Sequence, residues 1–183
     1  MDPKDALSRL TPEQLRALRR QAQAMPRQPR DGRVFPASPP QRRLWFLAQV
    51  GGNSAVYNVP VTVELRGELD RDALAWALAR VVERHESLRT TFESMEGAVC
   101  QRIHAAPSFP LDEDDLSALA ADDAQAAADA LLAASLAEPF DLARGPLLRA
   151  RLIRLAAGRH LLAIVMHHII CDGWSLAVLA REL

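Results

Sequence analysis

Two adjacent histidines, His167 and His168, are the residues best suited to chemistry in this sequence of 183 residues. Asp172 follows four positions after the second histidine, and Gly173 comes next. An imidazole with a pKa near the ordinary value of about 6.5 can take up and release a proton close to neutral pH. The run from residue 167 to 175 therefore predicts an acid–base site in which one histidine accepts the proton.

The histidine pair is expected to divide between the two faces of a strand. Side chains alternate along a strand, so His167 shares one face with Val165 and His168 shares the other with Met166. One metal ion cannot easily take both rings as ligands, and no further His or Cys stands at ligand spacing. We therefore predict no metal site, and at most one histidine facing a given cavity.

Asp172 has two possible roles that the sequence leaves open. It can cap a helix that begins at Gly173, or it can be a buried carboxylate that pairs with an arginine and fixes the loop holding His168. Cys171 has no basic neighbour that would activate its thiol, so it is expected to pack in the interior. Ser175 lacks a nucleophile-elbow pattern and is expected to be a helix residue.

The elements that position these residues follow from periodicity and from helix and turn signals. Ser38 and Asp70 each stand where a helix cap is expected, and Glu96-Gly97 stands where a hairpin turn is expected. Helices are expected at residues 39–50, 71–86, 122–137 and 173–183, and strands at 57–66, 90–96, 98–104, 147–155 and 160–166. This mixture predicts an α/β or α+β fold in which a mixed sheet is flanked by helices.

Length and composition exclude several classes of protein. The chain has the length of one domain, is 49% hydrophobic, and carries a net charge of −1, which argues against a general nucleic-acid binder. Two cysteines are too few for a disulfide framework, so a reducing cytoplasm is the expected location. No apolar run has the length of a membrane span, and no signal peptide is expected from the N-terminal residues.

The first 32 residues are expected to form an appendage that precedes a main domain at residues 33–183. Thr11, Pro12 and Gln14 fit a helix start, and residues 26–32 fit a linker. Residues 1–43 hold ten basic and four acidic residues, a balance of +6, whereas residues 111–141 hold nine acidic and no basic residues. Such asymmetry fits either surfaces for partners or solvated faces.

Four segments, taken together and in this order, resemble the condensation domains of nonribosomal peptide synthetases. They are residues 38–47 (SPPQRRLWFL), 57–60 (YNVP), 84–92 (RHESLRTTF) and 167–175 (HHIICDGWS). The last resembles the active-site motif of that family, which also occurs in chloramphenicol acetyltransferase. The resemblance implies a chloramphenicol acetyltransferase-like lobe and covers nearly all of the chain after the appendage.

The resemblance also implies roles for the motif residues. His168 would position or deprotonate an attacking amine, or stabilise the tetrahedral intermediate, whereas His167 would be structural. Asp172 would be held by an arginine, with Arg84 and Arg89 as candidates unless the partner lies outside this sequence. Gly173, Trp174 and Ser175 would line a substrate tunnel, and at Gly173 a side chain would obstruct it.

The implied reaction is formation of an amide bond between two carrier-bound thioesters, as in antibiotic biosynthesis. Donor and acceptor would arrive on the phosphopantetheine arms of upstream and downstream peptidyl carrier proteins, so no cofactor would be bound directly. The family's active site lies between two lobes, and we interpret this chain as the N-terminal lobe, cut just past the motif and inactive alone. Residues 1–25 would either dock an upstream synthetase protein or pack on the lobe.

Two other functions compete with this interpretation. The chain could be a complete acyltransferase of the chloramphenicol acetyltransferase type that uses acetyl-CoA, although residues 38–47 and 84–92 argue against it. It could also be a non-catalytic module that docks carrier proteins. Neither alternative involves nucleic acid or a membrane.

Overall fold

A computed structural model describes residues 32–51, 55–105 and 109–183. The expected helix after Thr11, and all of the expected linker except Gly32, lie outside these ranges. The described elements are β1 (Val34–Pro36), α3 (Pro39–Val50), β2 (Asn58–Arg66), α4 (Arg71–Arg84), β3 (Thr90–Met95), β4 (Ala98–Ile103), β5 (Asp112–Asp115), α5 (Ala121–Ala137), β6 (Leu148–Ala156), β7 (Arg159–His167) and α6 (Gly173–Glu182), with short 3-10 turns at Ala55–Tyr57 and Glu86–Arg89.

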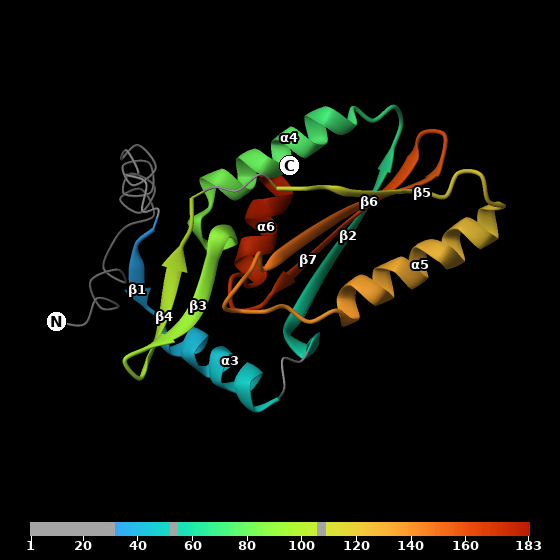
Figure 1. The fold of residues 1–183 in the computed structure, drawn as a ribbon. Helices are drawn as coiled ribbons and strands as arrows, with labels where there is room; N and C mark the ends of the chain where they lie inside the picture. Colours follow the sequence, from blue (N-terminus) through green and yellow to red (C-terminus); the bar gives the residue numbers. More distant parts are fainter. Residues whose placement is uncertain (1–31, 52–54, 106–108) are drawn as a thin grey trace, which may run out of the picture.

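The strands form two sheets, and β7 lies inside the larger one (Figure 1). The larger sheet has the order β2-β7-β6-β5, and β7 runs antiparallel to both of its neighbours. Its residues from His160 to His167 are all buried. The expected mixed sheet flanked by helices is confirmed, with β7 as the strand that delivers the histidine pair.

Helices cover both faces of the larger sheet. Ala124 and Ala128 of α5 pack with Ile153 and Leu161 in one apolar cluster. A larger cluster joins the other helices to the sheet, and it contains Leu78, Val81 and Val82 of α4, Ala48 of α3 and Leu179 of α6. Because its two sides are covered, β7 is continuously apolar from Leu161 to Met166 rather than alternating in polarity.

The smaller sheet has the order β1-β4-β3 and contains the expected hairpin. Glu96 and Gly97 form its two-residue turn with φ angles of 51° and 81°. Two positive φ angles are typical of the hairpin turn whose twist matches that of its strands.

The helix caps at Ser38 and Asp70 are also confirmed. Ser38 and Gln41 form a reciprocal capping box, in which the Ser38 amide donates to Gln41 Oε1 at 2.8 Å. Asp70 Oδ1 accepts from the amide of Ala73 at 2.9 Å. Helix α4 ends at Arg84, two residues before the expected end, because the chain tightens into a 3-10 turn after His85.

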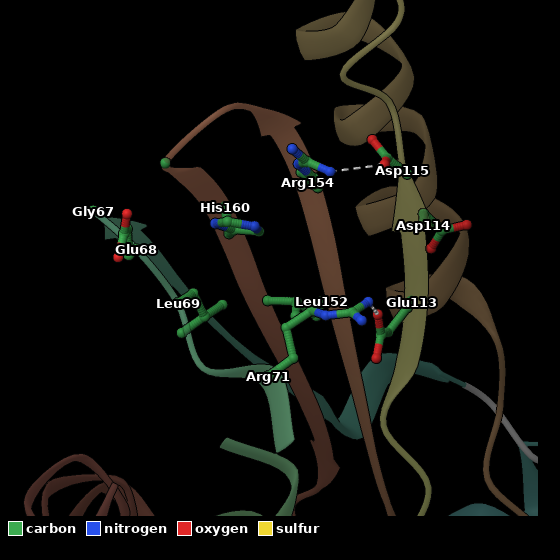
Figure 2. Close-up of a pocket in the computed structure, with 11 residues that line it drawn as sticks. Gly67, Glu68, Leu69, Arg71, Glu113, Asp114, Asp115, Leu152, Arg154 and His160 are labelled. Carbon is green, nitrogen blue, oxygen red and sulfur yellow. Dashed lines mark hydrogen bonds and ion pairs between the residues drawn. The ribbon is translucent and has the colours of Figure 1, made fainter. Parts of the chain in front are cut away.

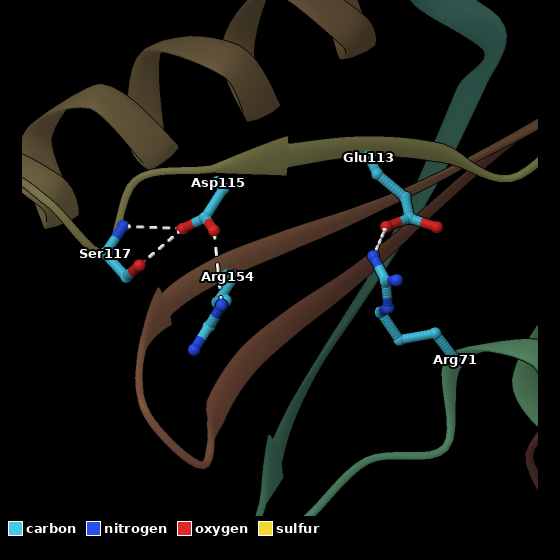
Figure 3. Close-up of polar contacts among 5 residues, drawn as sticks. All are labelled: Arg71, Glu113, Asp115, Ser117 and Arg154. Atoms are coloured by element: carbon cyan, nitrogen blue, oxygen red, sulfur yellow. Dashed lines mark hydrogen bonds and ion pairs between the residues drawn. The ribbon is translucent and has the colours of Figure 1, made fainter.

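Strand β5 lies between residues 104 and 122, where neither a helix nor a strand is expected from the sequence. Its four residues are all acidic, which is a poor composition for a strand. It pairs in parallel with β6, whose Arg151 lies 2.5 Å from Asp114 and whose Arg154 lies 3.3 Å from Asp115. Figure 3 shows Arg154 of β6 in contact with Asp115, and Arg71 at the start of α4 in contact with Glu113. Ion pairs with arginines distant in the sequence therefore hold this strand.

None of the helices in the described part of the chain combines the length and the hydropathy that a bilayer crossing demands.

We predict that the Asp114–Arg151 pair contributes more to stability than the more exposed Asp115–Arg154 pair. Side-chain exposure is 27% and 29% in the first pair and 57% and 47% in the second. A double-mutant cycle with Asp114→Asn and Arg151→Gln, read by urea unfolding, should give a coupling energy of about 1 kcal/mol. The matching cycle with Asp115→Asn and Arg154→Gln should give a smaller value, and the reverse order would contradict the prediction.

Candidate functional site

The histidine motif borders a cleft between the first turns of α3 and the loop that leads from β7 to α6. The cleft has a volume of about 750 Å³. His168 lines it and is exposed to solvent. The other lining residues are Ser38, Pro39, Pro40, Gln41, Arg43, Leu44, Leu47, Tyr57, Ile169, Ile170, Cys171, Asp172 and Ser175. The structure thus brings the first and the last of the four motif segments together around one open cavity.

Two backbone contacts fix the position of His168. Its amide donates to the carbonyl oxygen of Tyr57 at 2.8 Å. Its Nδ1 lies 2.6 Å from the carbonyl oxygen of Cys171. A carbonyl oxygen can only accept a hydrogen bond, so Nδ1 carries the ring proton. In the neutral ring, Nε2 then has a lone pair and can accept a proton.

His167 has the opposite arrangement. Its side chain is only 2% exposed, and its Nδ1 accepts a hydrogen bond from the amide of Ile169 at 3.1 Å. The rings of Tyr57 and Phe140 lie 6.1 Å and 6.3 Å from the His167 ring, centre to centre. Burial, together with the nearby charge of His168, lowers the pKa of His167 to about 4. His167 is therefore neutral at pH 7 and faces away from solvent, as a structural residue would.

Asp172 is the N-cap of α6, which is the first of the two roles open from the sequence. Its Oδ1 accepts hydrogen bonds from the amide of Ser175 at 2.8 Å and from the Ser175 hydroxyl at 2.7 Å. The Ser175 hydroxyl in turn accepts from the Asp172 amide at 3.2 Å. These bonds from Ser175 hold the pKa of the Asp172 carboxyl below its ordinary value.

The second role of Asp172, an ion pair with Arg84 or Arg89, does not occur within the described residues. Arg84 lies 3.7 Å from Glu182, and Arg89 donates to the carbonyl oxygen of His104. Arg84 ends α4 and Arg89 ends the 3-10 turn after it, whereas Asp172 turns its carboxylate back onto its own helix. An arginine partner for Asp172 would therefore have to come from outside the described residues.

The three residues expected to line a tunnel occupy different positions. Ser175 lines the histidine cleft and also a second cleft of about 690 Å³, which α6 borders together with the end of α4. Trp174 is 72% exposed and lines only the second of these. A side chain added at Gly173 would meet no described atom within 4 Å, so obstruction at Gly173 stays a prediction.

The backbone groups that orient His168 are not predicted by the sequence. Cys171 was expected to pack, and its thiol is buried, which together with the nearby Asp172 charge raises its pKa to about 11. Its carbonyl oxygen nevertheless binds the imidazole of His168. A backbone carbonyl has no signature in the residue types, so only the structure could reveal this contact.

A third cleft, of about 640 Å³, lies near the opposite end of β7 (Figure 2). It is lined by charged residues, including Arg71, Glu113 and Arg154, together with His160, whose buried Nδ1 has no partner within the described residues. His160 lies seven positions along the strand, or about 23 Å, from His167. No motif residue lines it, and its ion pairs are those that hold β5.

Nowhere in the described ranges do His, Cys, Asp and Glu side chains form a group that could hold a metal ion.

Comparison with known proteins agrees with this geometry. Residues 32–183 match the condensation domain family. One of the linear gramicidin synthase proteins of Brevibacillus parabrevis is 44% identical over 155 residues, which are 85% of this chain and 2% of that protein. Chondramide synthase cmdD from Chondromyces crocatus is 44% identical over 161 residues, which are 88% of this chain and 4% of that protein.

Solved structures extend the likeness to the fold. The starter condensation domain of rhizomide synthetase superposes with a TM-score of 0.76 at 29% identity, over 82% of this chain and 37% of that one. The first condensation domain of the calcium-dependent antibiotic synthetase, bound to a substrate analogue, gives 0.74 at 27% identity, over 82% and 36%.

The chain belongs to the condensation domain family of nonribosomal peptide synthetases. It corresponds to the N-terminal part of the solved condensation domains and spans only a few per cent of the curated synthetases. The expected chloramphenicol acetyltransferase-like lobe is confirmed.

We predict that His167 stays neutral well below pH 6. Because its pKa of about 4 in the folded state lies below the ordinary value of about 6.5, the unfolded chain binds more protons between these values. His167 therefore destabilises the fold as the pH falls from about 6.5 toward 4, by up to about 3 kcal/mol. Nitrogen-15 NMR of the histidine rings should show His167 with its proton on Nε2 at pH 5.5.

The matched control is His167→Phe, which should lose this part of the pH dependence of unfolding while other titrating groups keep theirs. A His167 ring that titrates near pH 6.5 would contradict the buried, neutral assignment.

Proposed function

We propose that this chain is the N-terminal lobe of a condensation domain that forms an amide bond. The donor is an acyl or peptidyl thioester, and the acceptor is the amine of an aminoacyl thioester. The observation that carries the proposal is the orientation of His168. Its Nδ1 binds the Cys171 carbonyl oxygen at 2.6 Å, which leaves the Nε2 lone pair to accept a proton in a cleft of about 750 Å³.

The reaction requires the protein mainly to place the two substrates and to transfer one proton. The amine nitrogen attacks the thioester carbonyl carbon, the C–N bond forms, and the C–S bond breaks. Nε2 of His168 takes the proton that the amine loses and passes it to the leaving thiolate. A thioester is already activated, so holding the two reactants together supplies much of the rate increase, and base assistance adds roughly 10²–10⁴-fold.

Both substrates would arrive on the phosphopantetheine arms of carrier proteins, one upstream and one downstream. The chain itself would then hold no cofactor, and the open cleft would receive the ends of these arms. Support comes from the curated relatives, which are synthases of peptide products such as linear gramicidin and chondramide.

We further propose that the lobe is inactive alone and that residues 1–32 are an appendage to it. His168 is exposed, and no described element lies over the cleft to exclude water. The solved relatives are nearly three times longer than the part this chain matches, since it covers 36–37% of them. The remaining part of the domain would supply the facing wall and an arginine for Asp172.

The decisive experiment measures dipeptide formation by the whole condensation domain between two loaded carrier proteins. His168→Ala should lower the rate by about 10²–10⁴-fold because it removes the proton acceptor. His104→Ala is a suitable control, because His104 does not line the cleft. Its ring contacts Thr91 instead. Both variants should retain the fold by circular dichroism.

Full activity of His168→Ala would contradict the proposed role of His168 as the proton acceptor. Transfer of acetyl from acetyl-CoA to a small alcohol by the lobe alone would instead support an acetyltransferase. Binding of loaded carriers without turnover, even in the whole domain, would support a docking module.

A further inference from the structure

Helix α6 follows the histidine loop directly, and its polar connections to other elements are concentrated at its far end. Within the described residues, Glu182 is the only α6 side chain that forms a hydrogen bond or ion pair with another element. Ser175 bonds with the cap residue Asp172, and Arg181 donates to Ala177 within the helix. The position of α6 therefore depends on Glu182 and on apolar packing.

The contact at Glu182 is short and partly shielded from water. Glu182 Oε2 lies 2.7 Å from Nε2 of His85, the C-cap residue of α4, and 3.7 Å from Nε of Arg84. The side chains of His85 and Glu182 are only 25% and 23% exposed. The hydrogen bond from His85, more than any other interaction, lowers the pKa of the Glu182 carboxyl. A charged acceptor in a half-buried setting makes this a strong hydrogen bond.

Apolar packing holds α6 at Leu179, near its far end, and at Leu176, nearer its first turn. Leu179 is 9% exposed and belongs to the main core, and Leu176 packs against that core. The other end of the helix leads straight into Cys171, whose carbonyl oxygen fixes His168. A helix of ten residues is about 15 Å long and moves as a stiff rod, so a shift at Glu182 is transmitted to its first turn.

We propose that Glu182 is a positioning residue for the reaction. By binding His85, it holds α6 at the angle that keeps the Cys171 carbonyl oxygen against Nδ1 of His168, and so keeps the ring proton off Nε2. The importance of this for catalysis rests on the proposed role of His168, but the positioning itself can be measured without any turnover.

The test is nitrogen-15 NMR of histidine-labelled chain, which reports which ring nitrogen of His168 carries the proton. In the parent chain the proton should reside on Nδ1. Glu182→Ala should shift the ratio of the two tautomers toward Nε2–H by about fivefold, as expected from weakening one hydrogen bond. Arg181→Ala is the matched control, because Arg181 is the adjacent charged residue of α6 and, among the described residues, its side chain hydrogen-bonds only within its own helix.

Two further variants keep the proposal falsifiable if Glu182→Ala folds poorly. Glu182→Gln retains an acceptor oxygen for His85 and should restore most of the parent tautomer ratio. His85→Ala should reproduce the shift of Glu182→Ala, and combining the two should add nothing, because both remove the same contact.

A His168 tautomer ratio that is unchanged in Glu182→Ala and His85→Ala, even with a lower melting temperature, would overturn the proposal and leave Glu182 a purely structural role. That result would not affect the proposed function, which depends on the His168→Ala rate. Conversely, full activity of the His168→Ala domain would contradict the proposed function without changing the tautomer result.

Discussion

The site depends on the burial of β7 and on the point where that burial ends. From His160 to His167 every residue of this strand is buried, with strands on both sides and helices over both faces. His167 is the last residue of the strand and is buried, the next residue His168 is exposed, and the chain is buried again from Ile169 to Cys171. Two residues of the same type therefore meet opposite environments one position apart, because the sheet ends between them. Burial makes the first ring a poor base, whereas the second ring is accessible to solvent.

Hydrogen bonds to backbone groups further distinguish the two histidine rings. The amide of Ile169 donates to Nδ1 of His167, whereas the carbonyl oxygen of Cys171 accepts from Nδ1 of His168. Both partners belong to the same short turn, so one loop conformation sets opposite tautomers in the two rings. The cap at Asp172 stabilises that conformation, because its carboxylate and the Ser175 hydroxyl satisfy amides at the start of α6. The carboxylate is thereby engaged in the loop and is not free to act on His168.

Local signals in the sequence predicted most of this arrangement. Ser38, Asp70 and the Glu96-Gly97 pair act within three or four residues, so their caps and turn could be predicted from the printed sequence. The apolar run of β7 was equally clear. What could not be predicted depends on contacts between distant residues. Strand β5 forms despite its acidic composition, because arginines of α4 and β6, up to 42 positions away in the sequence, compensate its charges.

The candidate site likewise has features that the sequence predicts and features that it does not. The histidine pair, its opposite faces and the buried Cys171 were all expected, since alternation along a strand is a local rule. The two alternatives for Asp172 could not be separated by sequence, because capping and arginine pairing use the same carboxylate at the same position. Because His85 and Glu182 are 97 positions apart, no local sequence pattern predicts their contact either.

In the proposed reaction one imidazole acts alone, and the geometry explains why the residues around it are mostly fixed rather than reactive. In the described cleft the Cys171 thiol is buried and its pKa is about 11, and the Asp172 carboxylate is held by Ser175. Neither can compete with Nε2 of His168 for a proton at neutral pH. A base that works alone must be held in one orientation, because no second group corrects a misplaced lone pair. The loop 167–172 supplies that orientation from one side, and α6, tied to α4 through its far end, supplies it from the other.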